Sequence, residues 1–155
     1  MKFRENLQID LWFAAVPARV YAAWTEPRLL AQWFAAHDWE VVDAEFVPAA
    51  GSSWRIEFAH PDGGRYVEEG EVERAEPFSL LEMTLRQTGL GPDPSETVVR
   101  VTIAPERGGT RMRFEQSGRF TEPSRSSSDV GWRTCFEKLR LSFSLIRSKM
   151  PDSGT

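Results

Sequence analysis

A long run of alternating apolar and polar residues is the feature that most constrains the fold of this chain. Trp54, Ile56 and Phe58 are apolar, and the residues between them are charged. The same period of two returns in three later segments, residues 81–86, 99–103 and 111–116. Such alternation is typical of strands with one face on a core and the other in water. The chain is therefore expected to form an antiparallel sheet whose apolar face needs a cover.

That cover is predicted near the C-terminus. An apolar stripe at helical spacing runs through Trp132, Phe136, Leu139, Phe143 and Ile146. A single stripe of this kind is typical of a helix that buries one face. Asp129 is expected to begin this helix, because a carboxylate suits the first turn. The preceding residues 121–128 are rich in serine and proline and are expected to form a loop.

Two short helices are predicted before the sheet. Pro17 and Pro27 each suit the first turn of a helix, since this turn does not use the backbone N–H that proline lacks. The second helix is expected to carry an apolar stripe at Leu29, Leu30, Trp33 and Phe34. Further strands are expected at residues 5–13, 39–47 and 65–75, with a hairpin turn at residues 60–64. The predicted order is one strand, two helices, six strands and one helix, and the fold class is α+β.

Length and composition limit the class of protein. The 155 residues suffice for one domain with its own core, expected over residues 1–150, with a polar tail at residues 151–155. The net charge of −4 argues against nucleic-acid binding, which needs a clustered basic surface. No apolar run approaches the length of a membrane span, so no membrane insertion is expected. Cys135 is the single cysteine, and the first residues form no apolar signal segment, so we expect a cytoplasmic protein.

Several motifs of the chain resemble those of a known family. The first reads Pro-x-x-Val-Tyr-x-x-Trp-Thr-x-Pro at residues 17–27 and continues to Trp33-Phe34. Others are Pro-Asp-Gly at 61–63, Gly-Glu-Val at 70–72, Gln-Ser-Gly at 116–118 and Gly-Trp at 131–132. Together, from about residue 5 to residue 143, the chain resembles the activator-of-Hsp90-ATPase-like branch of the START/Bet v 1 superfamily. Many members of this branch are bacterial.

This resemblance implies a helix-grip fold. In that fold a curved antiparallel sheet of about seven strands wraps around a long C-terminal helix, with a cavity between them. Relatives bind lipids, hormones or polyketide-like molecules, and some catalyse cyclisation or hydrolysis. The chain departs from the family at residues 47–52, where an acidic residue and a second glycine usually stand. A role that depends on that acidic residue is therefore not transferred.

The resemblance makes the space between sheet and helix the candidate ligand-binding site. Large apolar side chains are expected to line this space, or to fill it as core: Trp54, Met83, Leu85, Phe114, Trp132 and Phe136. Alternation places Glu68 on the face opposite the next three glutamates of its strand, so Glu68 is the candidate for an inward carboxylate. Gln116 continues the apolar face of the last strand and can point an amide inward. Tyr66, two residues before Glu68, is the third group expected to orient a ligand.

No cofactor, metal site or catalytic residue is predicted. A metal site needs three or four converging ligands, and His37, His60 and Cys135 have no ligand spacing. Cys135 lacks the neighbouring base that a nucleophile needs, and a free cysteine is most often a core residue. His37 is expected to be a polar loop residue. A pairing of His37 with Glu68 would instead suit an acid–base role.

Three functions stay open at this stage. The first is binding of an apolar or amphipathic small molecule between sheet and helix. The second is a cyclase- or hydrolase-like enzyme that uses the same cavity. The third is a protein-interaction module linked to an Hsp90-type chaperone or to a stress response, and a homodimer is compatible with each. The first is preferred, because the expected lining is mostly apolar and offers few groups for catalysis.

Overall fold

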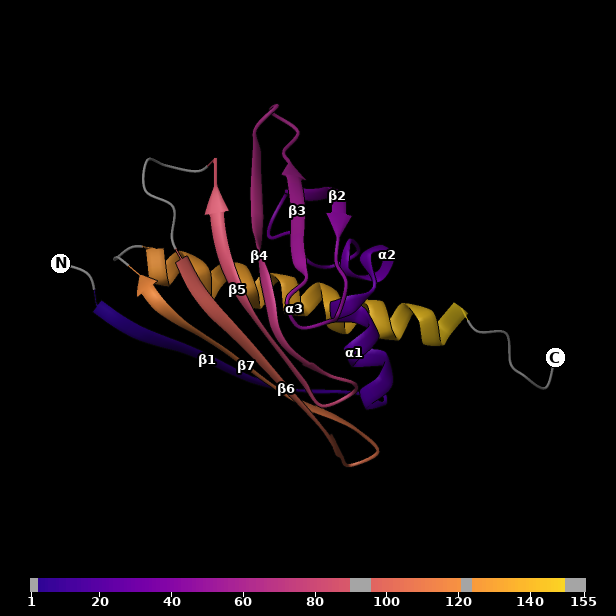
Figure 1. Cartoon of the computed structure of the whole chain (residues 1–155). Coiled ribbons are helices and arrows are strands. Elements are labelled where there is room, and N and C mark those ends of the chain that lie inside the picture. Colours follow the sequence, from indigo (N-terminus) through magenta and orange to yellow (C-terminus); the bar gives the residue numbers. More distant parts are fainter. Residues whose placement is uncertain (1–2, 90–95, 121–123, 150–155) are drawn as a thin grey trace.

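A computed structural model describes residues 3–89, 96–120 and 124–149. Its elements are β1 (Phe3–Phe13), α1 (Pro17–Thr25), α2 (Pro27–Leu30), β2 (Glu40–Glu45), β3 (Ser53–Ala59), β4 (Arg65–Glu76), β5 (Leu80–Thr88), β6 (Glu96–Glu106), β7 (Gly109–Phe120) and α3 (Ser124–Lys149). Figure 1 shows α3 running across one side of the sheet. The α+β class and the order of elements are as predicted. The predicted tail at residues 151–155 lies outside the described residues.

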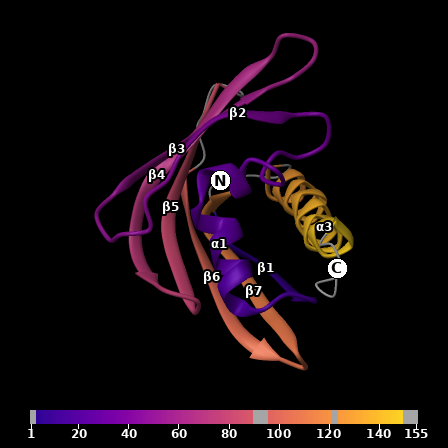
Figure 2. The same ribbon diagram turned by 90° about the vertical axis from the view of Figure 1, so that its right-hand side faces the viewer.

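The strands form one antiparallel sheet in the order β1-β7-β6-β5-β4-β3-β2. The first strand pairs with the last in unbroken register, from Phe3 opposite Phe120 to Phe13 opposite Thr110. The sheet curves, and α1 and α3 lie on its concave side (Figure 2). The curved sheet with its C-terminal helix is the helix-grip architecture that the resemblance implied, and the cavity expected between them stays a prediction.

The two faces of the sheet differ as the alternation predicted. On β3, Trp54, Ile56 and Phe58 are at most 1% exposed, whereas Arg55 and Glu57 keep contact with solvent. We call the side that carries the buried residues, toward α3, the inner face, and the opposite side the outer face. Because neighbouring strands repeat this pattern, the inner face forms one continuous apolar surface under α3.

An aromatic cluster joins the helices to the inner face. The ring of Phe114 in β7 lies 4.5 Å from Trp132 and 5.2 Å from Phe136, both in α3. Trp24 in α1 stacks on Phe114 and on Trp132, each with centroids 6.2 Å apart. Aromatic pairs at such separations stabilise a core beyond the area that they bury. The predicted C-terminal cover is therefore held mainly through aromatic contacts.

The second helix is shorter than predicted. α2 spans Pro27–Leu30, and Trp33 and Phe34 lie in the turn that follows it. The Trp33 N–H donates to the Leu30 carbonyl at 3.3 Å, an i to i−3 bond typical of a tighter turn. Both rings are buried all the same, and Trp33 Nε1 donates to the Ala23 carbonyl at 3.0 Å. The prediction was right that Leu30, Trp33 and Phe34 are buried, but Leu29 is only half-buried and the helix ends before Trp33.

The final helix begins earlier than predicted. α3 starts at Ser124, so Asp129 lies inside it, where Oδ1 accepts a hydrogen bond from Arg133 Nε at 2.9 Å. Serine is only moderately less favourable in a helix than most polar residues, so residues 126–128 extend the helix. The described members of the stripe are each at most 8% exposed: Trp132, Phe136, Leu139 and Phe143. Ile146 lies outside the described side chains. Within the described parts of the chain, no helix has the length and apolar character to cross a membrane.

Candidate functional site

The inner face is apolar over most of its area but becomes polar at one end. Glu68 in β4 lies opposite Gln87 in β5, and Thr97 in β6 lies opposite Leu85 in β5. Gln116 in β7 reaches Thr97 with its side chain. Residues opposite each other in an antiparallel pair share a face. Glu68, Gln87, Thr97 and Gln116 therefore form a row across four strands, which we call the inner polar belt.

The β6–β7 half of the inner polar belt is a closed hydrogen-bond network. Trp132 Nε1 in α3 donates to Gln116 Oε1 at 2.9 Å. Gln116 Nε2 donates to Thr97 Oγ1 at 2.8 Å, and Thr97 Oγ1 donates to the Leu85 carbonyl at 3.4 Å. Thr97 and Gln116 are both buried. Gln116 points inward as expected, but its amide joins α3 to the sheet, so both ends of the amide already have protein partners.

Glu68, in the β4–β5 half of the inner polar belt, has fewer hydrogen-bond partners among the described residues than Gln116 has. It lies opposite Ile56, which is buried on the inner face. Its Oε2 accepts a hydrogen bond from Gln87 Nε2 at 3.1 Å, and none of the ion pairs within the described chain involves its carboxyl. Burial raises the pKa of Glu68 to about 7, and the Gln87 hydrogen bond offsets only part of that rise. Glu68 and Gln87 both keep some exposed surface, so a small molecule can reach them.

Tyr66 is the aromatic neighbour of Glu68 on β4. Its ring stacks on Phe58 with centroids 4.4 Å apart and meets Trp39 at 4.7 Å in a T-shaped arrangement. The Tyr66 hydroxyl makes no hydrogen bond to another described residue. Burial, followed by the charges of Glu68 and Cys135, raises the pKa of Tyr66 well above its ordinary value. The phenol therefore stays neutral and is available as a donor or an acceptor.

Cys135 reaches the same region from α3 but has the properties of a core thiol. Its Sγ donates to a backbone carbonyl at 3.3 Å, and burial, with a smaller contribution from Glu68, raises its pKa to about 12. A thiol with so high a pKa is a poor nucleophile at neutral pH. Lys138, less than one turn further along α3, donates from Nζ to the carbonyls of Ala35 at 2.6 Å and His37 at 3.1 Å.

The two histidines lie away from the inner polar belt. His37 is exposed, has a positive φ of 52°, and makes no contact with Glu68 among those that the described residues form. The acid–base pair considered from the sequence is therefore not formed. His60 lies in the β3–β4 turn, where its Nδ1 accepts the Asp62 N–H at 3.2 Å. The described part of the chain contains no group of three or more His, Cys, Asp or Glu side chains suited to a metal.

The remaining predicted site residues are core side chains. Each of five is at most 3% exposed: Trp54, Met83, Leu85, Phe114 and Phe136. Trp132 is 8% exposed and is tied to Gln116. These residues form the apolar surroundings of the inner polar belt. The groups that a ligand reaches without moving the core are Glu68 and Gln87, with the Tyr66 hydroxyl beside them.

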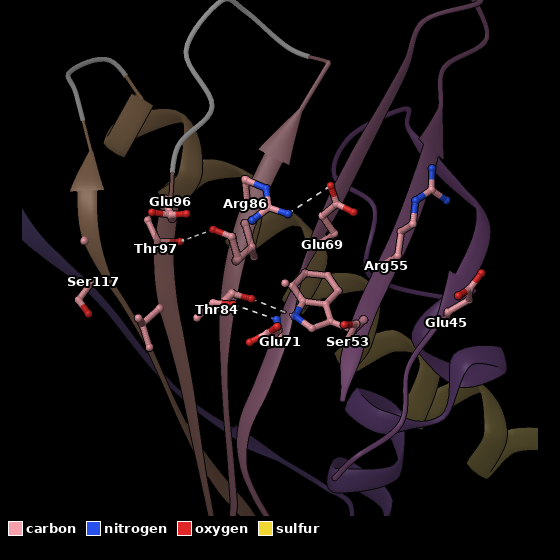
Figure 3. A pocket seen from close by; sticks show the side chains of 15 residues that line it. Glu45, Ser53, Arg55, Glu69, Glu71, Thr84, Arg86, Glu96, Thr97 and Ser117 are labelled. Atoms are coloured by element: carbon pink, nitrogen blue, oxygen red, sulfur yellow. Dashed lines mark hydrogen bonds and ion pairs between the residues drawn. The ribbon is translucent and has the colours of Figure 1, made fainter. Parts of the chain in front are cut away.

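A second candidate is an open recess of about 680 Å³ on the outer face (Figure 3). Polar residues from β2 to β7 line it: Glu45, Ser53, Arg55, Glu69, Glu71, Thr84, Arg86, Glu96, Thr97 and Ser117. Glu69 pairs with Arg86 at 3.5 Å, and the Glu71 N–H donates to Thr84 Oγ1 at 2.9 Å. Gly70 allows β4 to approach β5 here, because a β-carbon would overlap the Thr84 carbonyl. The charges of the recess are open to water, where an ion pair contributes little free energy to folding or binding. We therefore take the inner polar belt as the candidate site.

Comparison with known proteins identifies the family of the chain. The family model described as "Activator of Hsp90 ATPase homolog 1-like protein" matches residues 14–143. The chain belongs to this family. No curated protein sequence matches it.

Solved structures share the fold of this chain. A Rhodobacter sphaeroides protein is 25% identical, with 90% of this chain and 93% of the other covered and a TM-score of 0.79. A Mesorhizobium loti protein is 26% identical, with coverage of 90% and 97% and a TM-score of 0.73. A Silicibacter pomeroyi protein titled AHSA1 is 19% identical, with 91% of this chain and 99% of the other covered and a TM-score of 0.81. At this identity the likeness shows that the fold is shared and nothing about function.

One accessible residue of the candidate site was not predicted from the sequence. Gln87 lies two residues beyond Leu85, so extending the period of two along β5 would have placed it on the inner face. The outer recess has no such signal. Its lining residues are spread over six strands, and only the curvature of the sheet brings them together.

Proposed function

We propose that this protein binds a small amphipathic molecule on the inner face of its sheet. The polar part of the ligand lies against Glu68, Tyr66 and Gln87. The apolar part packs against the neighbouring aromatic side chains, Tyr66 and the half-buried Trp39. The observation that carries the proposal is the Glu68 carboxyl, which lies on an apolar face with a neutral amide as its hydrogen-bond partner.

The physical argument concerns groups that the protein leaves unsatisfied. Burial removes water from Glu68 without supplying a cation, so the charged form is destabilised. The Tyr66 hydroxyl on the same strand also makes no hydrogen bond to the residues that the structure describes. A few polar groups set in an apolar wall are the usual means by which ligand sites fix orientation. A ligand that bonds to these groups would stabilise the folded protein by mass action.

The proposal includes two expectations from the sequence. We treat residues 1–150 as one ligand-binding domain, and we place the protein in the cytoplasm. The structural neighbours support the first expectation, because the matches extend over nine-tenths of this chain.

Native mass spectrometry tests the proposal. We expect gently purified protein to carry a bound small molecule, or to take up added 1-octanol, with loss of the adduct on denaturation. Glu68→Gln and Tyr66→Phe should lower the bound fraction. Glu71→Gln, a matched change on the outer face of the same strand, should leave it unchanged. Protein that is empty after purification and takes up no 1-octanol would rule out the proposed function.

A further inference from the structure

The groups near Glu68 that remain available to a ligand are mainly hydrogen-bond acceptors. Glu68 Oε1 and the Gln87 side-chain oxygen have no partner within the described chain. Gln87 Nε2 already donates to Glu68 Oε2. The Tyr66 hydroxyl can accept as well as donate. A ligand that complements this set must therefore supply hydrogen-bond donors.

No charged group of the described residues neutralises Glu68. The groups that face it are uncharged at neutral pH and come from four elements: Ile56 in β3, Tyr66 in β4, Gln87 in β5 and Cys135 in α3. Lys138 in α3 donates to two backbone carbonyls and does not contribute to the pKa of Glu68. Arg55 and Arg86 lie on the outer face, in the lining of the recess. Among the described side chains no positive charge reaches this carboxylate, and a ligand cation would supply one.

Aromatic rings stand beside the carboxyl. Tyr66 stacks on Phe58, and Trp39 packs against Tyr66. The faces of Tyr66 and Phe58 cover each other, so these rings supply apolar surface for the body of a ligand, and the carboxylate supplies the attraction for a cation.

We propose that the polar end of the ligand is a protonated amine, carried on an apolar body. The ammonium donates to Glu68 Oε1 and to the Gln87 side-chain oxygen, and the apolar body packs against the neighbouring aromatic residues. This inference rests on the proposed function, because it names the chemical class of that ligand. An alcohol donates one hydrogen bond but leaves the carboxylate charge unbalanced. A carboxylic acid would place a second negative charge beside the first.

The proposal has a definite pH dependence. The ammonium binds the ionised form of Glu68, so amine affinity falls as Glu68 takes up a proton. Burial raises the pKa of Glu68 to about 7, so amine binding should be tighter at pH 8 than at pH 5.5. An exposed glutamate would still be largely ionised at pH 5.5. Binding of a neutral ligand should change much less between these two pH values, because an alcohol loses only the stronger acceptor and no opposite charge.

The test uses three molecules that share an eight-carbon chain: octylamine, 1-octanol and octanoate. Their affinities are measured by calorimetry at pH 8 and pH 5.5 for the wild type, Glu68→Gln and Glu71→Gln. At pH 8 octylamine should bind the wild type about tenfold or more tightly than 1-octanol, the scale of a hydrogen bond between charged groups. This preference should disappear in Glu68→Gln, fall at pH 5.5, and persist in Glu71→Gln.

The possible results separate this inference from the proposed function. If 1-octanol or octanoate binds as tightly as octylamine at pH 8, the amine is the wrong class although ligand binding stands. If none of the three binds the wild type, the proposed function fails together with the inference. If Glu68→Gln does not fold, the comparison of pH 8 with pH 5.5 on the wild type decides the question alone.

Discussion

Replacing Glu68 by glutamine should stabilise the protein at pH 8, and the gain should shrink as the pH is lowered. Burial raises the pKa of Glu68 from its ordinary 4.5 to about 7, so the folded protein holds this proton more tightly than the unfolded chain does. The resulting stabilisation is complete below pH 4.5 and is lost as the pH rises through 7. Glutamine carries no such proton and can still accept the hydrogen bond from Gln87.

The size of the effect follows from the change in pKa. Each pKa unit corresponds to about 1.4 kcal/mol, so the rise from 4.5 to about 7 gives an upper limit of about 3 kcal/mol. Glu68 keeps some contact with water, which screens its charge, so we expect about 1–3 kcal/mol. For a chain of this length, that difference corresponds to an increase of roughly 3–9 °C in the unfolding midpoint at pH 8.

Thermal unfolding followed by circular dichroism, without added ligand, measures this gain. The wild type, Glu68→Gln and Glu71→Gln are compared at pH 5, 6.5 and 8. Glu71 is exposed on the outer face of the same strand, so its variant should show little difference from the wild type at any of these pH values. The reasoning is refuted if the Glu68→Gln difference is independent of pH, or if this variant is less stable than the wild type at pH 8.

Three further predictions concern the framework of the site. Gly70→Ala should destabilise the protein by about 2 kcal/mol or more, because the added carbon overlaps a backbone carbonyl. Gly131→Ala should stabilise it by up to about 1 kcal/mol, because the new β-carbon has room and alanine favours a helix. Urea unfolding measures both changes, and equal effects would contradict the prediction. Trp132→Phe should cost about 1–3 kcal/mol in the same assay, because it leaves the buried Gln116 oxygen without its donor, and a neutral result would show that another donor replaces the indole. Burial raises the pKa of Cys135 to about 12, so a disulfide reagent at pH 8 should react very slowly with Cys135 in the native protein. The same reagent should label Cys135 fully in guanidinium. Rapid labelling of the native protein would contradict the buried position of the thiol.

The fold was largely predictable because its main signals are local. Strands such as β3 depend on a period of two that the sequence shows directly, and α3 depends on one apolar stripe. The wrong predictions concern positions where tertiary contacts determine the local structure. Trp33 and Phe34 have helical spacing, yet they reach the core from a turn because α2 ends at Leu30. The helix α3 begins at Ser124, although the serine-rich sequence there does not predict a helix.

The site was predictable only in part. Alternation was enough to assign Glu68 to the inner face. That no described side chain supplies it with a cation depends on how β5 and α3 pack against it. Gln116 was predicted to point inward, but its hydrogen bond to Trp132 was not. This bond joins β7 to α3, and the sequence pattern of neither element specifies where the two side chains meet. The ligand-binding role of these residues stays a prediction.

A nuclear magnetic resonance titration with octylamine and 1-octanol tests the central claim most directly, because it locates binding on one face of the sheet. We predict saturable shifts at the backbone amides of Glu68 and Gln87 and at the Trp132 indole N–H. The indole of Trp12, which is exposed and bonded to the Glu106 carbonyl, should not shift. Saturable shifts confined to the outer recess, or no saturable shift with either molecule, would contradict the account.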